Sequence, residues 1–239
     1  MSEYRFMNQL IEKEHIPTPA YVFDLDKMKE FAEKVKRCLT GKAEICYAMK
    51  ANPFLIKPML EIVSSLEVCS PGEFRICERA GIPMEKIVLS GVYKNPDDIA
   101  YMLDTYGNRG TYTVESLQHL KVLNDTAVRH GITLSVLIRV TSGNQFGIDE
   151  AEIRKIISER EKYTGIEIEG IQFYSGTQKR NLSQMQEELK HLDTFIRELE
   201  EIGGMEIRTL EYGPGFFVPY FVKDKSMRTE ELLGEFVEI

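Results

Sequence analysis

The sequence lacks the long apolar runs that mark membrane-spanning proteins and the basic clusters that mark nucleic-acid-binding proteins. No apolar stretch in the 239 residues approaches the roughly 20 that a membrane-spanning helix needs. The N-terminal MSEYRFMNQLIEKEHIPTP also has no apolar centre like that of a signal peptide. Basic residues number 30 against 38 acidic ones, without a basic stripe for phosphates. We therefore expect a cytoplasmic protein that binds neither membranes nor nucleic acid.

Several catalytic and metal-binding motifs are also missing. There is no H-E-x-x-H, no Walker-type G-x-x-x-x-G-K-[ST] and no C-x-x-C pair. The spacing of the four cysteines favours reduced thiols in a cytosolic protein, with a metal or disulfide role as the alternative. Nothing indicates a Ser-His-Asp or Cys-His site, since the histidines fall in the N-terminal arm or in helical runs, away from strand ends. The residues concerned are Cys38, Cys46, Cys69, Cys77, His15, His119, His130 and His191.

Strand-like and helix-like patterns alternate along the chain. The strand-like runs are 20–24, 44–50, 66–70, 86–91, 110–115, 133–140, 166–175 and 208–213. Met28, Phe31, Ala32 and Val35 define one helical face, and further helix-like runs are 96–106, 115–130, 150–162 and 182–202. Asp26 and Asn95-Pro96 mark helix starts, and Gly81, Gly107, Gly131 and Gly203 mark helix ends.

This alternation predicts an α/β protein with a parallel sheet and helices outside it. An open doubly wound sheet and a closed (β/α)8 TIM barrel both fit the pattern. A dinucleotide-binding sheet would carry G-x-G-x-x-G after its first strand, and none is present there. About 250 residues is typical of a barrel. We therefore favour a barrel, with residues 1–239 as one domain.

Function in a parallel barrel collects at the carboxyl ends of the strands. Lys50 stands there in CYAMKANP, and Arg139 ends another strand. The stretches SGT (175–177) and GPG (213–215) are glycine-bearing turns after strands, whose N–H groups could hold a phosphate. Each signal has an ordinary alternative, a solvated lysine or a simple tight turn. Together they indicate an amine that reacts with an aldehyde whose phosphate is held nearby, as pyridoxal 5'-phosphate requires.

The sequence resembles the fold-type III pyridoxal-phosphate-dependent amino-acid decarboxylases, nearest to the diaminopimelate branch of the diaminopimelate and ornithine decarboxylase family. The resemblance rests on motifs in family order over nearly the whole chain. These are TPAYVFDLDKM, CYAMKANP, LEVCSPGEF, IVLSGVYKNPDDI, VLIRV, QFGI, GIQFYSGTQ and EYGPGFFVPY.

The resemblance implies a role for each matching residue. Lys50 would carry the cofactor, with Glu67 as the acidic residue near it. Arg139 would lie on the active-site side. The remaining cofactor contacts would come from Tyr174, Gly176, Thr177, Gly213 and Gly215, with Thr177 and the two last glycines near the phosphate.

The chain departs from the family pattern at several points. Tyr174 stands where the family has a stacking histidine, Pro214 replaces a glycine, and Gln145 replaces a lysine or threonine. Family members also continue into an eighth strand, which brings a partner for the pyridine nitrogen, and into a β-domain. We count about seven barrel strands and expect the barrel to stop before its last one. A natural truncation, an engineered fragment or half of a split protein would each give this result.

Three interpretations follow from the resemblance. The first is a pyridoxal-phosphate-dependent decarboxylase of a basic or diamino amino acid. The second is a barrel that binds the cofactor without turnover, and the third is a degenerate paralogue that binds a partner chain. Because an unclosed barrel leaves two strand edges, we expect a homo-oligomer or a complementing C-terminal chain, and weak cofactor binding without it.

Overall fold

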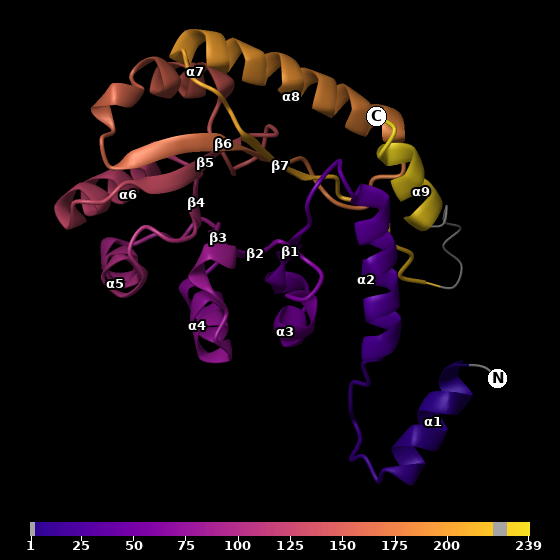
Figure 1. Cartoon of the computed structure of the whole chain (residues 1–239). Helices are drawn as coiled ribbons and strands as arrows, with labels where there is room; N and C mark the ends of the chain where they lie inside the picture. Colours follow the sequence, from indigo (N-terminus) through magenta and orange to yellow (C-terminus); the bar gives the residue numbers. More distant parts are fainter. Residues whose placement is uncertain (1–2, 222–228) are drawn as a thin grey trace.

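The computed structural model describes residues 3–221 and 229–239. Seven strands form one parallel sheet in the order β1-β2-β3-β4-β5-β6-β7. Figure 1 shows these strands along the inside of an arc, with helices around its outer side. A doubly wound sheet would reverse its strand order, whereas here each strand pairs with the next in sequence. The predicted TIM-barrel-like α/β architecture is therefore confirmed, as a curled sheet of seven strands.

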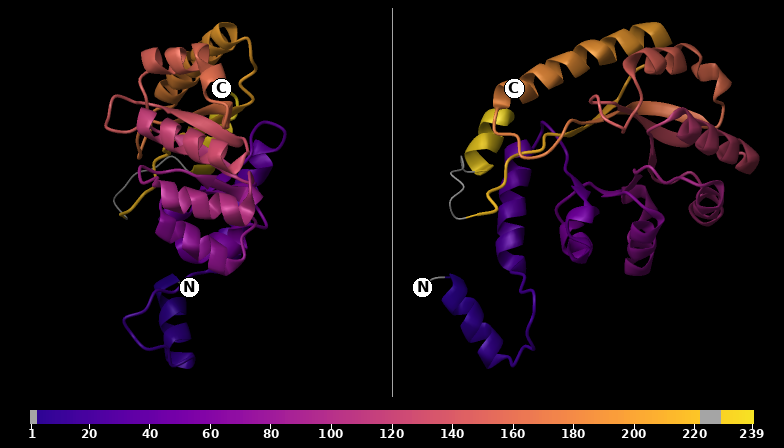
Figure 2. Two further views of the ribbon diagram at one scale, coloured as in Figure 1. Left: turned by 90° about the vertical axis from the view of Figure 1, so that its left-hand side faces the viewer. Right: turned by 180° about the vertical axis from the view of Figure 1, so that it is seen from behind.

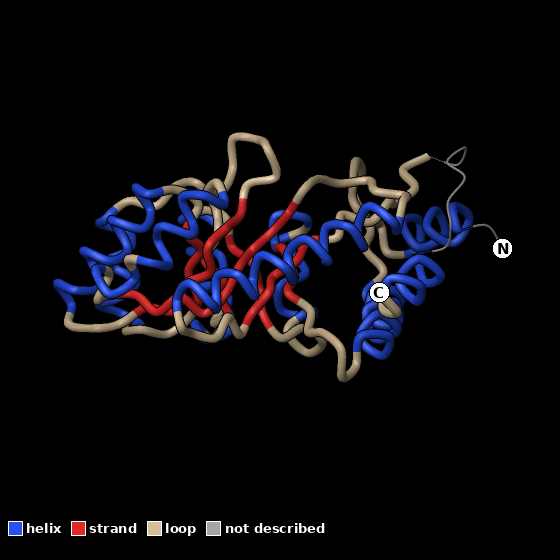
Figure 3. The backbone as a smooth tube through the Cα atoms, turned by 90° about the horizontal axis from the view of Figure 1, so that it is seen from above, coloured by secondary structure: helices blue, strands red, loops and turns tan. Residues whose placement is uncertain are grey.

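The strands and helices follow one another closely. The strands are β1 (Cys46–Ala48), β2 (Ser65–Val68), β3 (Ile87–Leu89), β4 (Thr111–Val114), β5 (Leu134–Val140), β6 (Ile166–Tyr174) and β7 (Thr209–Gly213). The α-helices are α1 (Glu3–Lys13), α2 (Leu25–Leu39), α3 (Ile56–Met59), α4 (Pro71–Ala80), α5 (Pro96–Tyr106), α6 (Leu117–His130), α7 (Glu150–Ser158), α8 (Leu182–Gly203) and α9 (Thr229–Phe236). Short 3₁₀ turns occupy Met49–Ala51, Pro53–Leu55, Met84–Lys86 and Arg160–Lys162. Figures 2 and 3 show the same arc from the side, from behind and from above.

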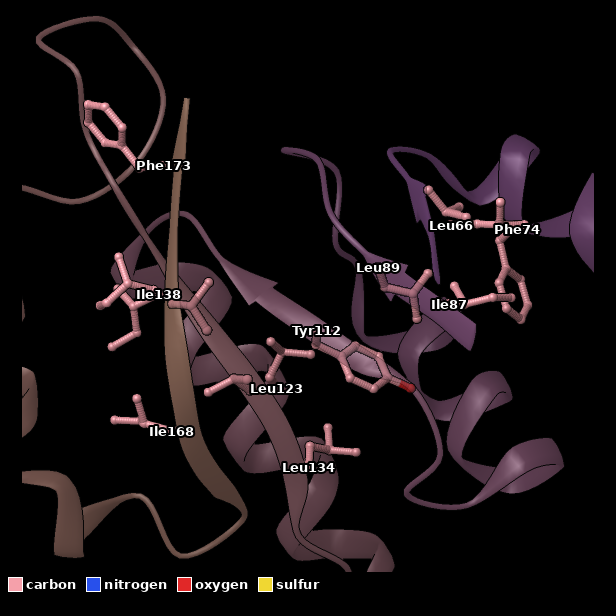
Figure 4. Packing of buried hydrophobic residues seen from close by; sticks show 14 of the residues in the cluster. Leu66, Phe74, Ile87, Leu89, Tyr112, Leu123, Leu134, Ile138, Ile168 and Phe173 are labelled. Atoms are coloured by element: carbon pink, nitrogen blue, oxygen red, sulfur yellow. The ribbon is translucent and has the colours of Figure 1, made fainter. Parts of the chain in front are cut away.

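The two faces of the sheet differ in polarity. Residues on the convex face, such as Leu66, Tyr112 and Ile138, are buried against the helices (Figure 4). The concave face instead carries polar side chains in register across neighbouring strands, for example Arg139 beside Gln172. Alternating side chains in strands produce this division. The hydrophobic core therefore lies between sheet and helices, which leaves the concave face for chemistry.

One predicted strand is absent and one helix begins elsewhere. Residues 20–24 form no strand, and Tyr21 and Phe23 in this run are exposed. Alternation alone predicts a strand, but the run is part of the connection between α1 and α2, which Figure 1 shows away from the sheet. Helix α2 is capped by Asp24, whose Oδ1 accepts from the Lys27 N–H at 3.0 Å, and not by the predicted Asp26.

The other helix ends agree largely with the sequence. Asn95 caps α5 through its Oδ1, which accepts from the Asp98 N–H at 2.9 Å. Gly81 and Gly131 adopt the left-handed conformation after α4 and α6. After α8 the capping residue is Gly204, one position beyond the predicted Gly203, which still belongs to the helix.

The two end strands of the sheet each have one unpaired edge. Among the described residues, β1 pairs only with β2, and β7 pairs only with β6. Outside this gap, α9 packs against α2 and α8. The Lys42 Nζ donates to the Val237 carbonyl at 2.8 Å, and the Phe236 ring stacks on Tyr212 at 6.1 Å between centroids. The helix layer thus continues across the gap between β7 and β1.

No helix in the described ranges combines the length and the apolar character that crossing a membrane requires.

Candidate functional site: the mouth of the curled sheet

The predicted site residues gather at the carboxyl ends of the strands, an end we call the mouth. Lys50 follows β1, while Glu67 lies in β2 and Arg139 in β5. Gly176 and Thr177 follow β6, which ends at Tyr174. Gly213 ends β7 and Gly215 follows it. A parallel sheet places all these strand ends on one side, so the shared location was predictable from the chain order.

Lys50 is held at the mouth by a short turn. The Met49–Ala51 turn is anchored by the fully buried Met49, and the Tyr47 hydroxyl donates to the Asn52 carbonyl at 3.0 Å. The lysine side chain is 57% exposed, and its Nζ lies 3.6 Å from Glu67 Oε2. The Cys69 Sγ lies 3.9 Å from the same Nζ. The amine therefore stands accessible at the mouth, beside a carboxylate.

Partial burial lowers the pKa of Lys50. The nearby Glu67 carboxylate and the Cys69 thiol together outweigh this effect, so the pKa is raised above its ordinary value. Lys50 is therefore an ammonium at neutral pH in the free protein. Burial alone would favour the neutral amine, but it does not prevail in this state. A reaction at Nζ must first remove a proton, and Glu67 Oε2 is the adjacent carboxylate oxygen.

Behind Lys50, a buried glutamine connects three strands across the concave face. Gln172 Nε2 donates to Glu211 Oε1 at 2.7 Å, and lies 3.4 Å from both Glu67 Oε1 and Ser90 Oγ. Burial raises the pKa of Glu211 to about 7, and the negative charge of Glu67 adds to this, against the Gln172 hydrogen bond. Our sequence analysis did not identify Gln172. The sequence feature that could have identified Gln172 is its place in β6, two residues before Tyr174 and hence on the same face of the sheet.

A second polar cluster surrounds Arg139. Its Nη1 lies 2.8 Å from Oε2 of Glu115, a carboxylate that is almost fully buried after β4. Lys94 is buried beside it, with Nζ donating to the Gly91 carbonyl at 2.7 Å and to Thr113 Oγ1 at 3.3 Å. Burial lowers the pKa of Lys94 to about 8, despite Glu115 at 4.0 Å. Sequence reasoning missed Lys94 and Glu115, although Glu115 directly follows β4 and Arg139 lies next to the last residue of β5.

One histidine lies closer to this cluster than predicted. His119 belongs to the first turn of α6, yet its Nδ1 accepts from the Glu115 N–H at 3.3 Å. Its Nε2 lies 3.0 Å from the Val92 carbonyl. The prediction that all histidines lie away from strand ends is therefore wrong for His119, because a helix that follows a strand begins at the same mouth. Both ring nitrogens have backbone partners, so this histidine holds the loop beside it.

The loops after β6 and β7 pack closely; we call residues 175–180 and 214–218 the loop pair. Gly215 has φ +65°, and a Cβ on it would come within 1.9 Å of the Gly176 carbonyl oxygen. A Cβ on Gly213 would lie 2.7 Å from the Tyr174 ring. Gly215 therefore requires glycine, whereas a side chain at Gly213 would displace the Tyr174 ring. Tyr174 shares the concave face with Gln172 and is 38% exposed, so its ring stands at the mouth and not in the helix layer.

The loop pair offers unused hydrogen-bond donors. Within residues 3–221 and 229–239, the backbone N–H groups of Thr177 and Gly215 and the Thr177 hydroxyl have no protein partner. Clustered N–H groups of this kind bind anions. An accessible lysine ammonium, backbone N–H groups without a protein partner and a flat aromatic ring thus lie at one mouth. The fold and these groups are typical of a barrel-type domain that would bind a phosphate-bearing aldehyde such as pyridoxal phosphate.

Comparison with known families agrees with this class. Residues 25–238 match the family described as "Pyridoxal-dependent decarboxylase, pyridoxal binding domain", and the chain belongs to this family. The cofactor of the family is pyridoxal phosphate.

Individual relatives extend the comparison. Diaminopimelate decarboxylase from Aquifex aeolicus is 30% identical over 232 residues, which cover 90% of this chain and 54% of that protein. L-glutamyl-[BtrI acyl-carrier protein] decarboxylase from Niallia circulans is 25% identical, over 88% of this chain and 52% of that protein. A crystal structure from Aquifex aeolicus superposes with a TM-score of 0.83 at 30% identity, over 97% of this chain and 57% of that one. The chain thus spans little more than half the length of these relatives.

The raised pKa of Glu211 predicts a pH dependence of stability. Folded Glu211 retains its proton up to about pH 7, whereas the unfolded chain releases it near the ordinary value of 4.5. Between these values the folded state binds more protons, so this group makes the free energy of unfolding fall as pH rises. Glu211→Gln removes that fall. In urea unfolding, the variant should therefore gain stability relative to wild type between pH 5 and pH 8.

Glu201→Gln, at an exposed position of α8, is the matched control and should keep the wild-type pH profile. Equal pH slopes for Glu211→Gln and wild type would contradict the assignment.

Proposed function

We propose that this chain is the cofactor-binding part of a pyridoxal-phosphate-dependent decarboxylase of a basic or diamino amino acid, with meso-diaminopimelate as the first candidate substrate. The observation that carries the proposal is the Lys50–Glu67 pair, 3.6 Å apart, at a mouth that also contains the loop pair. Several relatives, from different organisms, are named diaminopimelate decarboxylase. The Niallia circulans relative has a different substrate in its name, so family membership alone does not select the amino acid.

In this proposal each side chain has a defined task. Lys50 binds the cofactor through Nζ, and Glu67 Oε2 holds the ammonium beforehand and accepts its proton. The Thr177 hydroxyl and the N–H groups of the loop pair bind the phosphate, and Gly176, Gly213 and Gly215 keep the backbone close enough to do so. The bound cofactor supplies an electron sink for the carbon–carbon bond that breaks.

The remaining residues shape the pocket. Tyr174 offers a ring face for stacking at the mouth. Arg139 is held by Glu115 Oε2 at 2.8 Å, which fixes its guanidinium on the concave face. Gln172 and Glu211 form the floor behind Lys50, where the short 2.7 Å hydrogen bond fixes the amide.

We further propose that the chain acts in the cytoplasm with a partner, either a second copy or a complementing chain. Over residues 3–221 and 229–239, β1 and β7 each have an unpaired edge, which supports a partner because free strand edges favour pairing. The cysteines Cys38, Cys46, Cys69 and Cys77 are free, which suits a reducing compartment.

A second candidate function is cofactor binding without turnover. It is favoured by the one unpaired edge that β1 and β7 each have among the described residues, which leaves the interior of the sheet accessible to water. Assays with chemically different substrates separate the two candidates.

The substrate assay measures CO₂ release from meso-diaminopimelate, lysine, ornithine and arginine at saturating pyridoxal phosphate. We expect release to be fastest from meso-diaminopimelate, but slower than the ~1–10³ per second typical of enzymes, because two sheet edges remain open. Lys50→Ala should abolish it. No release from any of the four, by protein that carries the cofactor on Lys50, would favour the non-catalytic candidate.

The cofactor should attach to Lys50 alone. Incubation with excess pyridoxal phosphate, borohydride reduction and peptide mapping should find a pyridoxyl group on the peptide containing Lys50. Lys94 is the internal control, because it is buried with acceptors of its own. A pyridoxyl group on Lys94 or Lys179, with Lys50 unmodified, would reject the assignment.

The phosphate cradle can be tested through its backbone. Gly215→Val should weaken pyridoxal phosphate binding at least tenfold, because any Cβ there meets the Gly176 carbonyl and the positive φ disfavours valine. Gly234→Val is the control, since a Cβ at Gly234 meets no atom within 4 Å. Unchanged affinity in Gly215→Val would show that the loop pair does not hold the phosphate.

A further inference from the structure

A single carboxylate in α8 gathers hydrogen bonds from three segments around the loop pair. Glu188 Oε2 accepts from Lys179 Nζ at 2.7 Å and from the Tyr212 hydroxyl at 2.6 Å. Glu188 Oε1 accepts from Ser175 Oγ at 2.7 Å and from Lys179 Nζ at 3.0 Å. Gln184 adds a fifth contact at 3.2 Å. The loop after β6, strand β7 and helix α8 thus meet at Glu188.

This cluster is well shielded from water. The Lys179 side chain is 5% exposed and that of Glu188 is 13% exposed. An ion pair at such a depth is strongly coupled, because removing one member leaves the other charge buried without a partner. The pair therefore holds its two elements together far more firmly than a surface pair would.

The backbone of Lys179 also joins the two loops of the loop pair through two hydrogen bonds, which we call the seam. Its N–H donates to the Gly215 carbonyl at 2.8 Å, and its carbonyl accepts from the Phe217 N–H at 2.9 Å. The neighbouring Gln178 side chain accepts from the Val218 N–H at 2.7 Å and donates to the Val218 carbonyl at 3.1 Å. Movement of Lys179 would therefore shift both loops together.

The conformation of this segment requires such support. Gln178 has φ +60°, a left-handed conformation that is strained for a non-glycine residue. Gly176, two residues earlier, has φ +135°. A loop in this conformation keeps its shape only where neighbouring contacts enforce it. The contacts available are the seam and the Lys179–Glu188 pair.

We propose that Lys179 and Glu188 are positioning residues that set the preference of the protein for phosphorylated over phosphate-free pyridoxal. The inference rests on the proposed function, in which the loop pair holds the phosphate. Neither residue touches the phosphate in this scheme, because the Lys179 ammonium donates to both carboxylate oxygens of Glu188. The pair instead fixes the spacing between the N–H groups of Thr177 and Gly215.

The test compares two ligands in the same variants. Absorbance titrations measure the Kd of the full chain for pyridoxal 5'-phosphate and for pyridoxal. Lys179→Met should raise the Kd for pyridoxal phosphate roughly tenfold or more, as loss of a buried partner does, and change the Kd for pyridoxal by less than about twofold. Lys179→Arg should restore most of the preference, because it can again pair with Glu188.

Glu188→Gln provides a second, nearly isosteric variant if Lys179→Met folds poorly, and it should lose the same preference. The double variant should lose no more than either single one, since both changes disrupt one pair. The matched control is Arg197→Met in α8, which breaks the exposed pair with Asp193 and should leave both Kd values unchanged.

The outcomes separate this inference from the proposed function. Equal weakening of both ligands in Lys179→Met, or no weakening of either, overturns the positioning role. If Gly215→Val loses phosphate preference while Lys179→Met and Glu188→Gln keep it, the cradle stands and the inference is wrong. If wild type binds both ligands equally, the cradle itself is wrong.

Discussion

The parallel register between neighbouring strands is the constraint on which the site depends. Because side chains alternate between faces, one register assigns each strand residue either to the helix layer or to the concave face. Glu67, Arg139 and Gln172 fall on the concave face together, as the contact between Gln172 of β6 and Glu67 of β2 demonstrates. A shift of one residue in any strand would bury these charges among leucines and isoleucines. Because such burial is costly, the apolar core excludes a shifted register and thereby fixes the positions of the polar site residues.

The charges on the concave face are arranged in pairs. Glu67 lies opposite Lys50, and Glu115 lies opposite Arg139 with Lys94 beside it. Within the part of the chain that the structure describes, no cation contacts Glu211 directly; an amide holds it instead, which is consistent with its raised pKa. Apart from the exposed Lys50, these side chains are largely shielded from water, so each charge needs a partner. This pairing explains how so polar a surface exists inside a curled sheet.

Sequence reasoning predicted the barrel class and the common location of the site residues, since both follow from the order of strands and helices. Each of the seven sheet strands had been recognised as a run, whereas residues 20–24 alternate in the same way and form no strand. Pairing depends on a neighbouring edge, and no local pattern contains that information. Lys94, Glu115 and Gln172 were missed because their importance comes from contacts between strands. In the sequence itself, no local pattern distinguishes this lysine, glutamate and glutamine from others of the same type.

The helix layer closes through a contact between the two ends of the described chain. Lys42 follows α2, and its partner Val237 lies 195 residues later, just after α9. Contacts of such sequence separation are slow to form, because the intervening chain must first be ordered. During synthesis, α2 therefore emerges long before α9, and its contact surface for α9 remains open until residues 229–239 have left the ribosome. Assembly of this layer is a late event in folding, however early the individual strand and helix units take shape.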